Sequence, residues 1–161
     1  DDVIIVPGQC KSAINTGFED LYFGSWKQYE QNNINWLLNQ GETDSYETGP
    51  HVDVTLGTDE GYYVYIETSP PTKPGDKAIL VSEFIDPVAQ GSSSCFALWY
   101  FMYGDDVGEL SVWLNDTVTG MRVLKNITGE QGFFWFPLYL SIDNANEFRI
   151  AIQGVVSLLE N

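Results

Sequence analysis

Apolar and polar residues alternate along several stretches of this chain with a period of two, the period at which an extended strand turns its side chains to opposite faces. Residues 147–153 (EFRIAIQ) show the pattern most clearly. Phe148, Ile150 and Ile152 share one face there, and charged and amide side chains occupy the other. This alternation predicts a strand with one buried face.

Two further stretches alternate in the same way, and each is bounded by residues that favour turns. The first follows the glycine- and aspartate-rich residues 104–108 and is a hairpin candidate, while the second spans residues 61–67. The side chains expected to point inward are Leu110, Val112 and Leu114 in the first and Tyr62, Val64 and Ile66 in the second.

Two stretches are apolar on both faces, namely residues 95–103 (CFALWYFMY) and residues 133–142 (FFWFPLYLSI). A continuous apolar run of this length is typical of a strand buried on both sides. The first is therefore predicted to be a central strand whose outer face is covered by loops. Pro137 lies inside the second stretch. Because proline donates no ladder hydrogen bond, it indicates an edge strand, a bulge or a strand start.

Turn residues separate the predicted strands, and helical patterns are weak. Residues 69–76 and 90–94 are rich in proline, glycine and serine and are predicted to be loops. Residues 33–40 are compatible with a turn, because asparagine favours caps and loops over helix interiors. Many short strands with turns between them predict an all-β fold, an antiparallel β-sandwich of jelly-roll type. We expect one domain without internal repeats.

The charge of the chain excludes several classes of partner. The 161 residues include 23 acidic and 7 basic side chains, which gives a formal net charge of -16. Such a surface repels phosphate backbones and anionic lipid, so we expect no nucleic-acid binding and no membrane insertion. The only histidine, His51, follows a glycine–proline turn and has no nucleophile or paired-carboxylate pattern beside it. An enzyme is therefore not expected.

Cysteines and glycosylation sequons favour an extracellular location. The chain has two cysteines, Cys10 and Cys95, and a bridge between them would contribute about 4–5 kcal/mol in the chain-entropy model. N-glycosylation sequons begin at Asn115 and Asn126. No stretch is long and apolar enough to span a bilayer, and the first residues do not have the pattern of a signal peptide. We therefore expect a secreted protein in a mature or trimmed form.

A series of short motifs occurs in a fixed order along the chain. The motifs are Phe18-Glu19-Asp20, Ser25-Trp26, Asn35-Trp36, Thr48-Gly49-Pro50, Asp53-Val54-Thr55, residues 61–69 (GYYVYIETS), Cys95 with residues 99–104 (WYFMYG), and residues 107–112 (VGELSV). In order and spacing they resemble the MAM domain, the extracellular module of meprins, neuropilins and receptor-type phosphatases. The resemblance covers nearly the whole chain and implies a domain at residues 10–161, preceded by an N-terminal arm or edge strand at residues 1–9.

The cysteines depart from the family pattern. Asn15 or Thr16, and also Ser25, stand where family members commonly carry cysteines, so the short N-terminal disulfide of the family is absent. Cys95 keeps its place, but its habitual partner beyond the last strand does not appear. The resemblance therefore implies that Cys10 pairs with Cys95 in place of that partner.

Some MAM domains hold a calcium or sodium ion, and the resemblance carries that site to Glu19, Asp53 and Glu160, with Asp20 as a further candidate. A hard cation such as Ca²⁺ prefers six to eight oxygen ligands, which carboxylates from distant segments can supply. The alternative is that Glu19 caps local backbone donors and that Leu159 marks a lost site.

The resemblance implies a secreted adhesion or assembly module that binds a protein partner, with a second copy of the chain as one candidate, and that has no catalytic role. The alternative is a calcium-assisted carbohydrate-binding module in which an exposed Trp36 or Tyr29 stacks on a sugar. We expect instead that Trp26, Trp36 and Phe18 pack at the edge of the sandwich, with the amides of residues 32–35 tying the loop to backbone groups. The sequence does not identify the residues that contact a partner.

Residues 3–6 (VIIV) precede the first motif and have two interpretations. The favoured one is an edge strand within the chain's own sheet. The other is an arm that adds to the sheet edge of a neighbouring molecule and so builds a chain of subunits.

Overall fold

The computed structural model describes residues 15–45, 47–105 and 107–157. The predictions for Cys10, Glu160 and residues 1–9 lie outside these residues and stay predictions. Within the described ranges the regular structure consists of nine strands and no helix. The strands are β1 (Lys27–Gln28), β2 (Leu37–Gln40), β3 (Tyr62–Tyr65), β4 (Lys77–Val81), β5 (Ser94–Met102), β6 (Glu109–Asp116), β7 (Gly120–Thr128), β8 (Gly132–Ile142) and β9 (Phe148–Val155).

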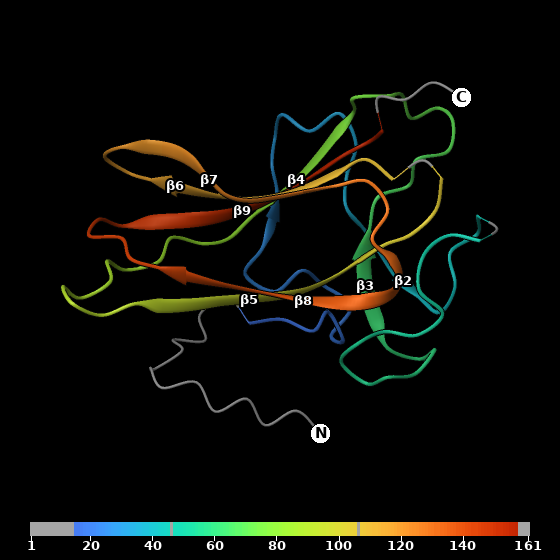
Figure 1. Cartoon of the computed structure of the whole chain (residues 1–161), viewed down its shortest axis with the longest axis horizontal. Coiled ribbons are helices and arrows are strands. Elements are labelled where there is room, and N and C mark those ends of the chain that lie inside the picture. The colour runs from blue at the N-terminus through green and yellow to red at the C-terminus, as the bar shows by residue number, and fades with distance from the viewer. Residues whose placement is uncertain (1–14, 46, 106, 158–161) are drawn as a thin grey trace.

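The strands form two facing layers, which Figure 1 shows one above the other. One layer is a five-stranded antiparallel sheet in the order β1-β4-β9-β6-β7. The other consists of two antiparallel pairs, β5 with β8 and β2 with β3. This arrangement confirms the predicted all-β antiparallel sandwich of jelly-roll type.

Apolar side chains from both layers fill the space between them. The five-stranded sheet contributes a set that is at most 1% exposed: Leu80, Val112, Leu114, Phe148 and Ile150. Phe96 and Ile142 meet them from the opposite layer. The inward faces predicted from alternation in β6 and β9 are therefore confirmed, and full burial of each such side chain contributes roughly 1.5–3 kcal/mol.

The connection from β5 to β6 crosses from one layer to the other and passes close to β9. A Cβ atom at Gly108 would lie 1.9 Å from the carbonyl oxygen of Val155. Real Cβ atoms do not approach backbone this closely, so the crossing requires glycine at this position. The hairpin predicted after residues 104–108 is formed by β6 and β7.

The aromatic and amide residues near the N-terminus pack as predicted. Trp26 is 6% exposed and belongs to the main core, while Trp36 packs against the same core. The Asn32 side chain clamps β4, because its Nδ2 donates to the Ile79 carbonyl (3.2 Å) and its Oδ1 accepts from the Ile79 N–H (3.0 Å). Gln28 holds Trp36 in the same way, donating to the Trp36 carbonyl at 2.7 Å and accepting its N–H at 3.2 Å.

Three details of the strand prediction are wrong. β5 is not a central strand, because within the described residues it pairs only with β8, and its outer face is exposed. In β3 the most buried ring is Tyr63 (5% exposed), whereas Tyr62 is half-buried and bonds to Gln40 near the surface. Leu37–Gln40 is a strand rather than a turn, because it pairs with β3. Pro137 does lie on an edge strand, one of its three predicted positions.

Asp116 anchors the turn between β6 and β7. Its carboxylate is 4% exposed and accepts the N–H groups of Val118 (2.7 Å) and Thr119 (2.8 Å). The amide groups of Asn144 and Asn146 also donate to it, at 2.9 Å and 3.0 Å. These hydrogen bonds, foremost that from Thr119, hold the pKa of Asp116 well below its usual range, although burial opposes them.

We expect Asp116 to make the fold acid-sensitive. Because the native pKa is depressed, its contribution to stability is complete above the unfolded-state pKa of about 3.9 and is lost as the pH falls towards the native value. The difference in unfolding free energy between the wild type and Asp116→Asn should be largest near neutral pH and shrink below about pH 4. Urea denaturation at a series of pH values measures it, with Asp143→Asn, an exposed site, as the control. A difference that does not change with pH would contradict the assignment.

Candidate functional site

The outer face of the β5–β8 pair carries several exposed apolar side chains. Phe96 and Leu98 point into the core, so their neighbours in β5 point outward. The same alternation applies to β8. We call the outward side chains the aromatic face: Ala97, Trp99 and Phe101 on β5, and Phe133, Trp135, Pro137 and Tyr139 on β8. Trp99 is 39% exposed, Phe133 38% and Tyr139 47%.

The strand register leaves the two most accessible rings of this face as diagonal neighbours. Trp99 lies opposite Pro137, and Tyr139 lies opposite Ala97. Diagonal neighbours across an antiparallel pair are close enough for aromatic side chains to meet one partner together. The compact Ala97 and Pro137 between the rings leave an even surface on which both rings can be covered.

A bulge in β8 gathers aromatic rings at the other end of the face. Tyr100 pairs with Phe136, and Met102 pairs with Gly132. Between these two pairs β5 has one residue, Phe101, whereas β8 has three, residues 133–135. Phe133 and Trp135 consequently both contact the Phe101 ring, with centroids 5.3 Å and 5.5 Å away. The rings fix one another in T-shaped arrangements, which keeps this end of the face rigid.

The connection between β2 and β3 (residues 41–61) covers the bulged end. The Trp135 indole Nε1 donates to the Val52 carbonyl at 2.8 Å. The His51 ring lies 4.9 Å from the Phe133 ring, and the Tyr63 ring lies 5.9 Å from that of Trp135. The sequence predicts loops over the outer face of residues 95–103. In the structure this connection covers only the bulged end, and Trp99 and Tyr139 are exposed.

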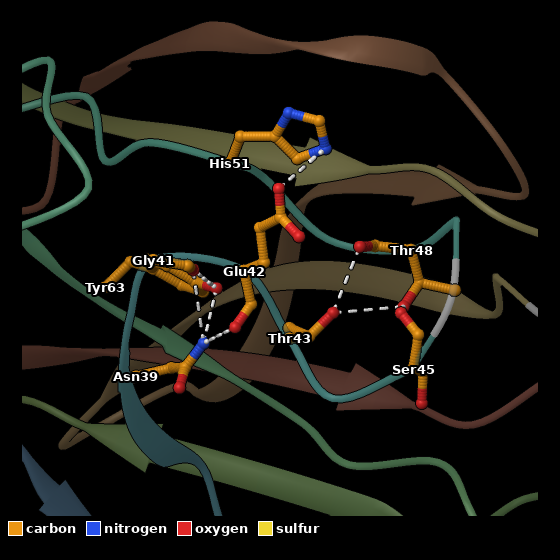
Figure 2. Close-up of polar contacts among 8 residues, drawn as sticks. All are labelled: Asn39, Gly41, Glu42, Thr43, Ser45, Thr48, His51 and Tyr63. Carbon is orange, nitrogen blue, oxygen red and sulfur yellow. Dashed lines mark hydrogen bonds and ion pairs between the residues drawn. The ribbon is translucent and has the colours of Figure 1, made fainter.

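Hydrogen bonds hold the start of this connection in shape, as Figure 2 shows. The Tyr63 hydroxyl donates to the Gly41 carbonyl at 2.6 Å and accepts from Asn39 Nδ2 at 2.6 Å. Further along, the Thr43 hydroxyl donates to the Thr48 carbonyl at 3.0 Å. Burial of the Tyr63 hydroxyl raises its pKa, although the Asn39 amide opposes the shift.

His51 is a surface residue, as its sequence context indicates. Its side chain is exposed, and Nε2 lies 3.5 Å from Glu42 Oε1 (Figure 2). Its other contact is the Phe133 ring. These contacts are those of a surface side chain that packs within its own loop and against β8.

Two of the residues predicted to bind a cation meet beside the start of β3. Asp53 is 1% exposed and accepts three backbone N–H groups, from Thr55 (2.5 Å), Leu56 (2.8 Å) and Thr58 (3.2 Å). The Glu19 carboxylate accepts the N–H of Tyr62 at 3.2 Å and 3.3 Å. A Cβ atom at residue 61 would lie 2.0 Å from Asp53 Oδ1, so this contact needs Gly61. Asp20 is exposed in the turn before β1.

The described carboxylates do not assemble a cation site. No group of three or more histidine, cysteine, aspartate or glutamate side chains with metal-binding geometry occurs within the described ranges. The Asp53 oxygens are already directed at backbone donors, and a Ca²⁺ ion needs six to eight oxygen ligands. Glu19 does cap a backbone donor, as in the alternative stated above, but the donor is the distant Tyr62 N–H rather than a local group. Because Glu160 lies outside the described residues, calcium binding stays a prediction.

The modification candidates lie in different surroundings. Asn126 is exposed on β7, the edge strand of the five-stranded sheet. Asn115 is half-buried on β6 with strands on both sides, opposite Met121 and Arg149. Cys95 is half-buried at the start of β5, and the pairing predicted for it involves a residue that the structure does not describe.

Sequence reasoning missed the aromatic face. The signal was present as the apolarity of both faces in residues 95–103 and 133–142. The sequence predicts a covered outer face for residues 95–103, whereas Trp99 is open in the structure. It predicts no exposed binding face for residues 133–142, where Tyr139 is open. The exposed face is the feature most directly suited to binding.

Comparisons with known proteins agree with the motif series. The family model described as "MAM domain, meprin/A5/mu" matches residues 16–159. MAM domain-containing glycosylphosphatidylinositol anchor protein 1 of rat is 33% identical over 144 residues, and so is the human protein. MAM domain-containing glycosylphosphatidylinositol anchor protein 2 of rat is 30% identical over 153 residues. Each match covers 86% of this chain but only 15% or 16% of the relative.

Proposed function

Because the chain belongs to the MAM domain family, we propose that it is an extracellular adhesion or assembly module that binds a protein partner through the aromatic face and carries out no catalysis of its own. The single observation that supports this role is the exposure of Trp99 and Tyr139 on a rigid, paired region of sheet. Exposed aromatic patches of this kind mark sites of interaction.

The physical case for binding rests on preorganisation. Tryptophan and tyrosine supply much of the binding energy at protein interfaces, because their large rings lose little conformational entropy when they are covered. Trp99 and Tyr139 lie within the β5–β8 ladder, which fixes their backbone before any partner arrives. Covering both rings would remove apolar surface from water at a small ordering cost.

The chain spans about 15% of the length of the relatives it matches. The names of those relatives describe glycosylphosphatidylinositol-anchored proteins, and that attachment is a statement about them. In the described part of this chain, no helix is long and apolar enough to cross a membrane. Secretion and the Cys10–Cys95 disulfide belong to the proposal for this chain, whereas self-binding and calcium binding stay predictions from the sequence.

The carbohydrate-binding alternative required an exposed Trp36 or Tyr29. Trp36 instead packs against the core, and a Cβ atom at Gly154 would lie 3.2 Å from its ring. Tyr29 is half-buried, and its N–H donates to the Ile79 carbonyl at 2.9 Å. Trp36 is therefore structural and Tyr29 is not fully exposed, and the protein-binding role is the one we propose.

An array of purified extracellular protein domains, which includes this chain itself, tests the proposal. The chain should bind at least one domain saturably, and Trp99→Ala with Tyr139→Ala should abolish the signal. Binding that is saturable but insensitive to these substitutions would move the site away from the aromatic face. A complete lack of binding across the array, with the folded state verified by circular dichroism, would contradict the adhesion role.

Glycosylation offers a separate check on the extracellular location. When the chain is produced through a secretory pathway, we expect a glycan at Asn126, because this side chain is exposed on an edge strand. Asn115 is flanked by strands on both sides and should carry little or none. Mass spectrometry of Asn126→Gln should show the loss of one glycan, and Asn115→Gln should leave the mass of the glycoform unchanged. The reverse pattern would contradict this expectation.

A further inference from the structure

Positive charge is distributed unequally between the two layers. The described lysine and arginine residues all lie on strands of the five-stranded sheet or in the loop before β4: Lys27, Lys73, Lys77, Arg122, Lys125 and Arg149. The strands β2, β3, β5 and β8, and the connection at residues 41–61, contain none. The layer that carries the aromatic face therefore has no basic side chain of its own along these segments.

The segments next to the bulged end of the aromatic face carry several carboxylates. We call them the acidic rim: Glu42, Asp44, Glu47, Glu67 and Asp105. Glu42 lies beside His51, whose ring contacts Phe133. Asp105 follows Tyr103, whose ring lies 5.0 Å from that of Phe133.

The rim also reaches the rings of β3. Glu67 lies two residues after Tyr65, and Asp44 lies in the loop that the Thr43–Thr48 hydrogen bond closes. Burial, followed by the charges of Glu67 and Asp44, raises the pKa of Tyr65. Glu47 lies in the loop that packs beside Gly104, where its carbonyl oxygen would be 3.8 Å from a Cβ atom. The carboxylates of the acidic rim thus lie on segments that adjoin the rings of the bulged end.

An exposed aromatic face with carboxylates near one end is matched by a segment that carries several cationic side chains. A guanidinium or ammonium group is attracted to the face of tryptophan or tyrosine, and arginine also binds carboxylates with two parallel hydrogen bonds. The chain itself contains a contact between a cation and an aromatic ring, because the Arg149 guanidinium lies 5.3 Å from the Phe84 ring centroid. No described basic residue of the aromatic layer competes for its rings.

We infer that the partner of the aromatic face is a protein segment rich in arginine or lysine, whose cations lie over the exposed rings and against the acidic rim. This inference rests on the proposed function and names the chemistry of its partner. A second copy of the chain fits less well, because each copy carries a net charge of -16 and two copies repel each other. Association should be fast and should weaken as salt is added.

A charged peptide and its neutral counterpart test the inference. The probe is an acetylated and amidated decapeptide that alternates arginine and serine, and the counterpart replaces each arginine with citrulline, which has the same shape without the charge. In spectra of nitrogen-15-labelled protein, the arginine peptide should shift the indole N–H signals of Trp99 and Trp135 saturably. The signal of Trp113, which lies on the other sheet and donates to Ser111, should not move. The citrulline peptide should cause no shift.

Two variants with the same change in net charge show whether binding depends on the acidic rim or on the overall charge of the chain. Asp44→Asn with Glu47→Gln and Asp105→Asn should weaken peptide binding about five- to tenfold. Glu30→Gln with Glu83→Gln and Asp143→Asn changes the net charge equally at exposed sites elsewhere, and it should weaken binding less than about twofold. Equal losses in the two variants would show non-specific attraction and overturn the inference.

The outcomes distinguish this inference from the proposed function. If an array partner needs Trp99 and Tyr139 but the arginine peptide neither binds nor competes with it, the adhesion role stands and the cationic partner is wrong. If light scattering shows the chain associating with itself through the aromatic face, the occupant is a second copy and the inference is also overturned. If the array yields no partner and the arginine peptide binds as described, the cationic chemistry stands and the adhesion role does not.

Discussion

Replacing Asp53 with alanine should lower the free energy of unfolding by about 3–5 kcal/mol. The Asp53 carboxylate is 1% exposed and is the acceptor for three backbone N–H groups of the loop that follows it. Hydrogen bonds to a charged acceptor contribute more than neutral ones, and donors left without an acceptor add a desolvation cost. Urea denaturation measures the change. Asp59→Ala, an exposed turn residue, is the control and should have little effect.

Calcium dependence shows whether Asp53 acts as a loop anchor or as a metal ligand. As an anchor, it should cause the same loss on substitution in calcium and in chelator, and the chelator should leave the wild type unchanged. If the chelator instead lowers the stability of the wild type to that of Asp53→Ala, an ion bound at Asp53 carries the stabilisation. That result would restore the calcium site predicted from Glu19, Asp53 and Glu160.

The double substitution Trp99→Ala with Tyr139→Ala should weaken binding to an array partner by at least about 30-fold, which corresponds to roughly 2 kcal/mol. Both rings are more than a third exposed, so their truncation should cost little folding stability. Surface plasmon resonance with the purified partner measures the affinity. Met121→Ala with Val123→Ala removes exposed apolar side chains from β7 on the other sheet and should leave the affinity within about twofold.

The pair of variants is informative in either direction. Equal loss in both would show that the partner responds to general surface hydrophobicity. A loss confined to the β7 variant would place the binding surface on the five-stranded sheet, where Val118, Met121 and Val123 are also exposed. Thermal unfolding of each variant excludes a trivial loss of folded protein.

Local sequence patterns predicted the parts of the fold that alternation controls. β6 and β9 have one apolar and one polar face, so the inward positions of Leu114 and Ile150 follow from the period alone. The clamp by Asn32 was also predictable, because asparagine side chains bind the backbone where the chain is irregular. Asp53-Val54-Thr55 carries the local pattern of an aspartate that accepts an N–H two residues on, although its burial does not follow from the pattern.

Other features depend on contacts between distant segments and could not be predicted in the same way. The strand at Leu37–Gln40 forms because β3 pairs with it, about 25 residues further along the chain. Alternation places Tyr62 on the inward face, but Tyr63 packs against the Trp135 ring from a distant strand and is the more buried of the two. The openness of the aromatic face has the same origin, because apolar side chains look alike in sequence whether a loop or a partner covers them.

Cross-saturation measured on the complex with an array partner tests the central claim most directly. Saturation of the partner's protons should attenuate the indole N–H signal of Trp99 in the labelled chain and leave that of Trp113 at full intensity. Attenuation of Trp113 with Trp99 unaffected would place the partner on the opposite sheet and contradict the account.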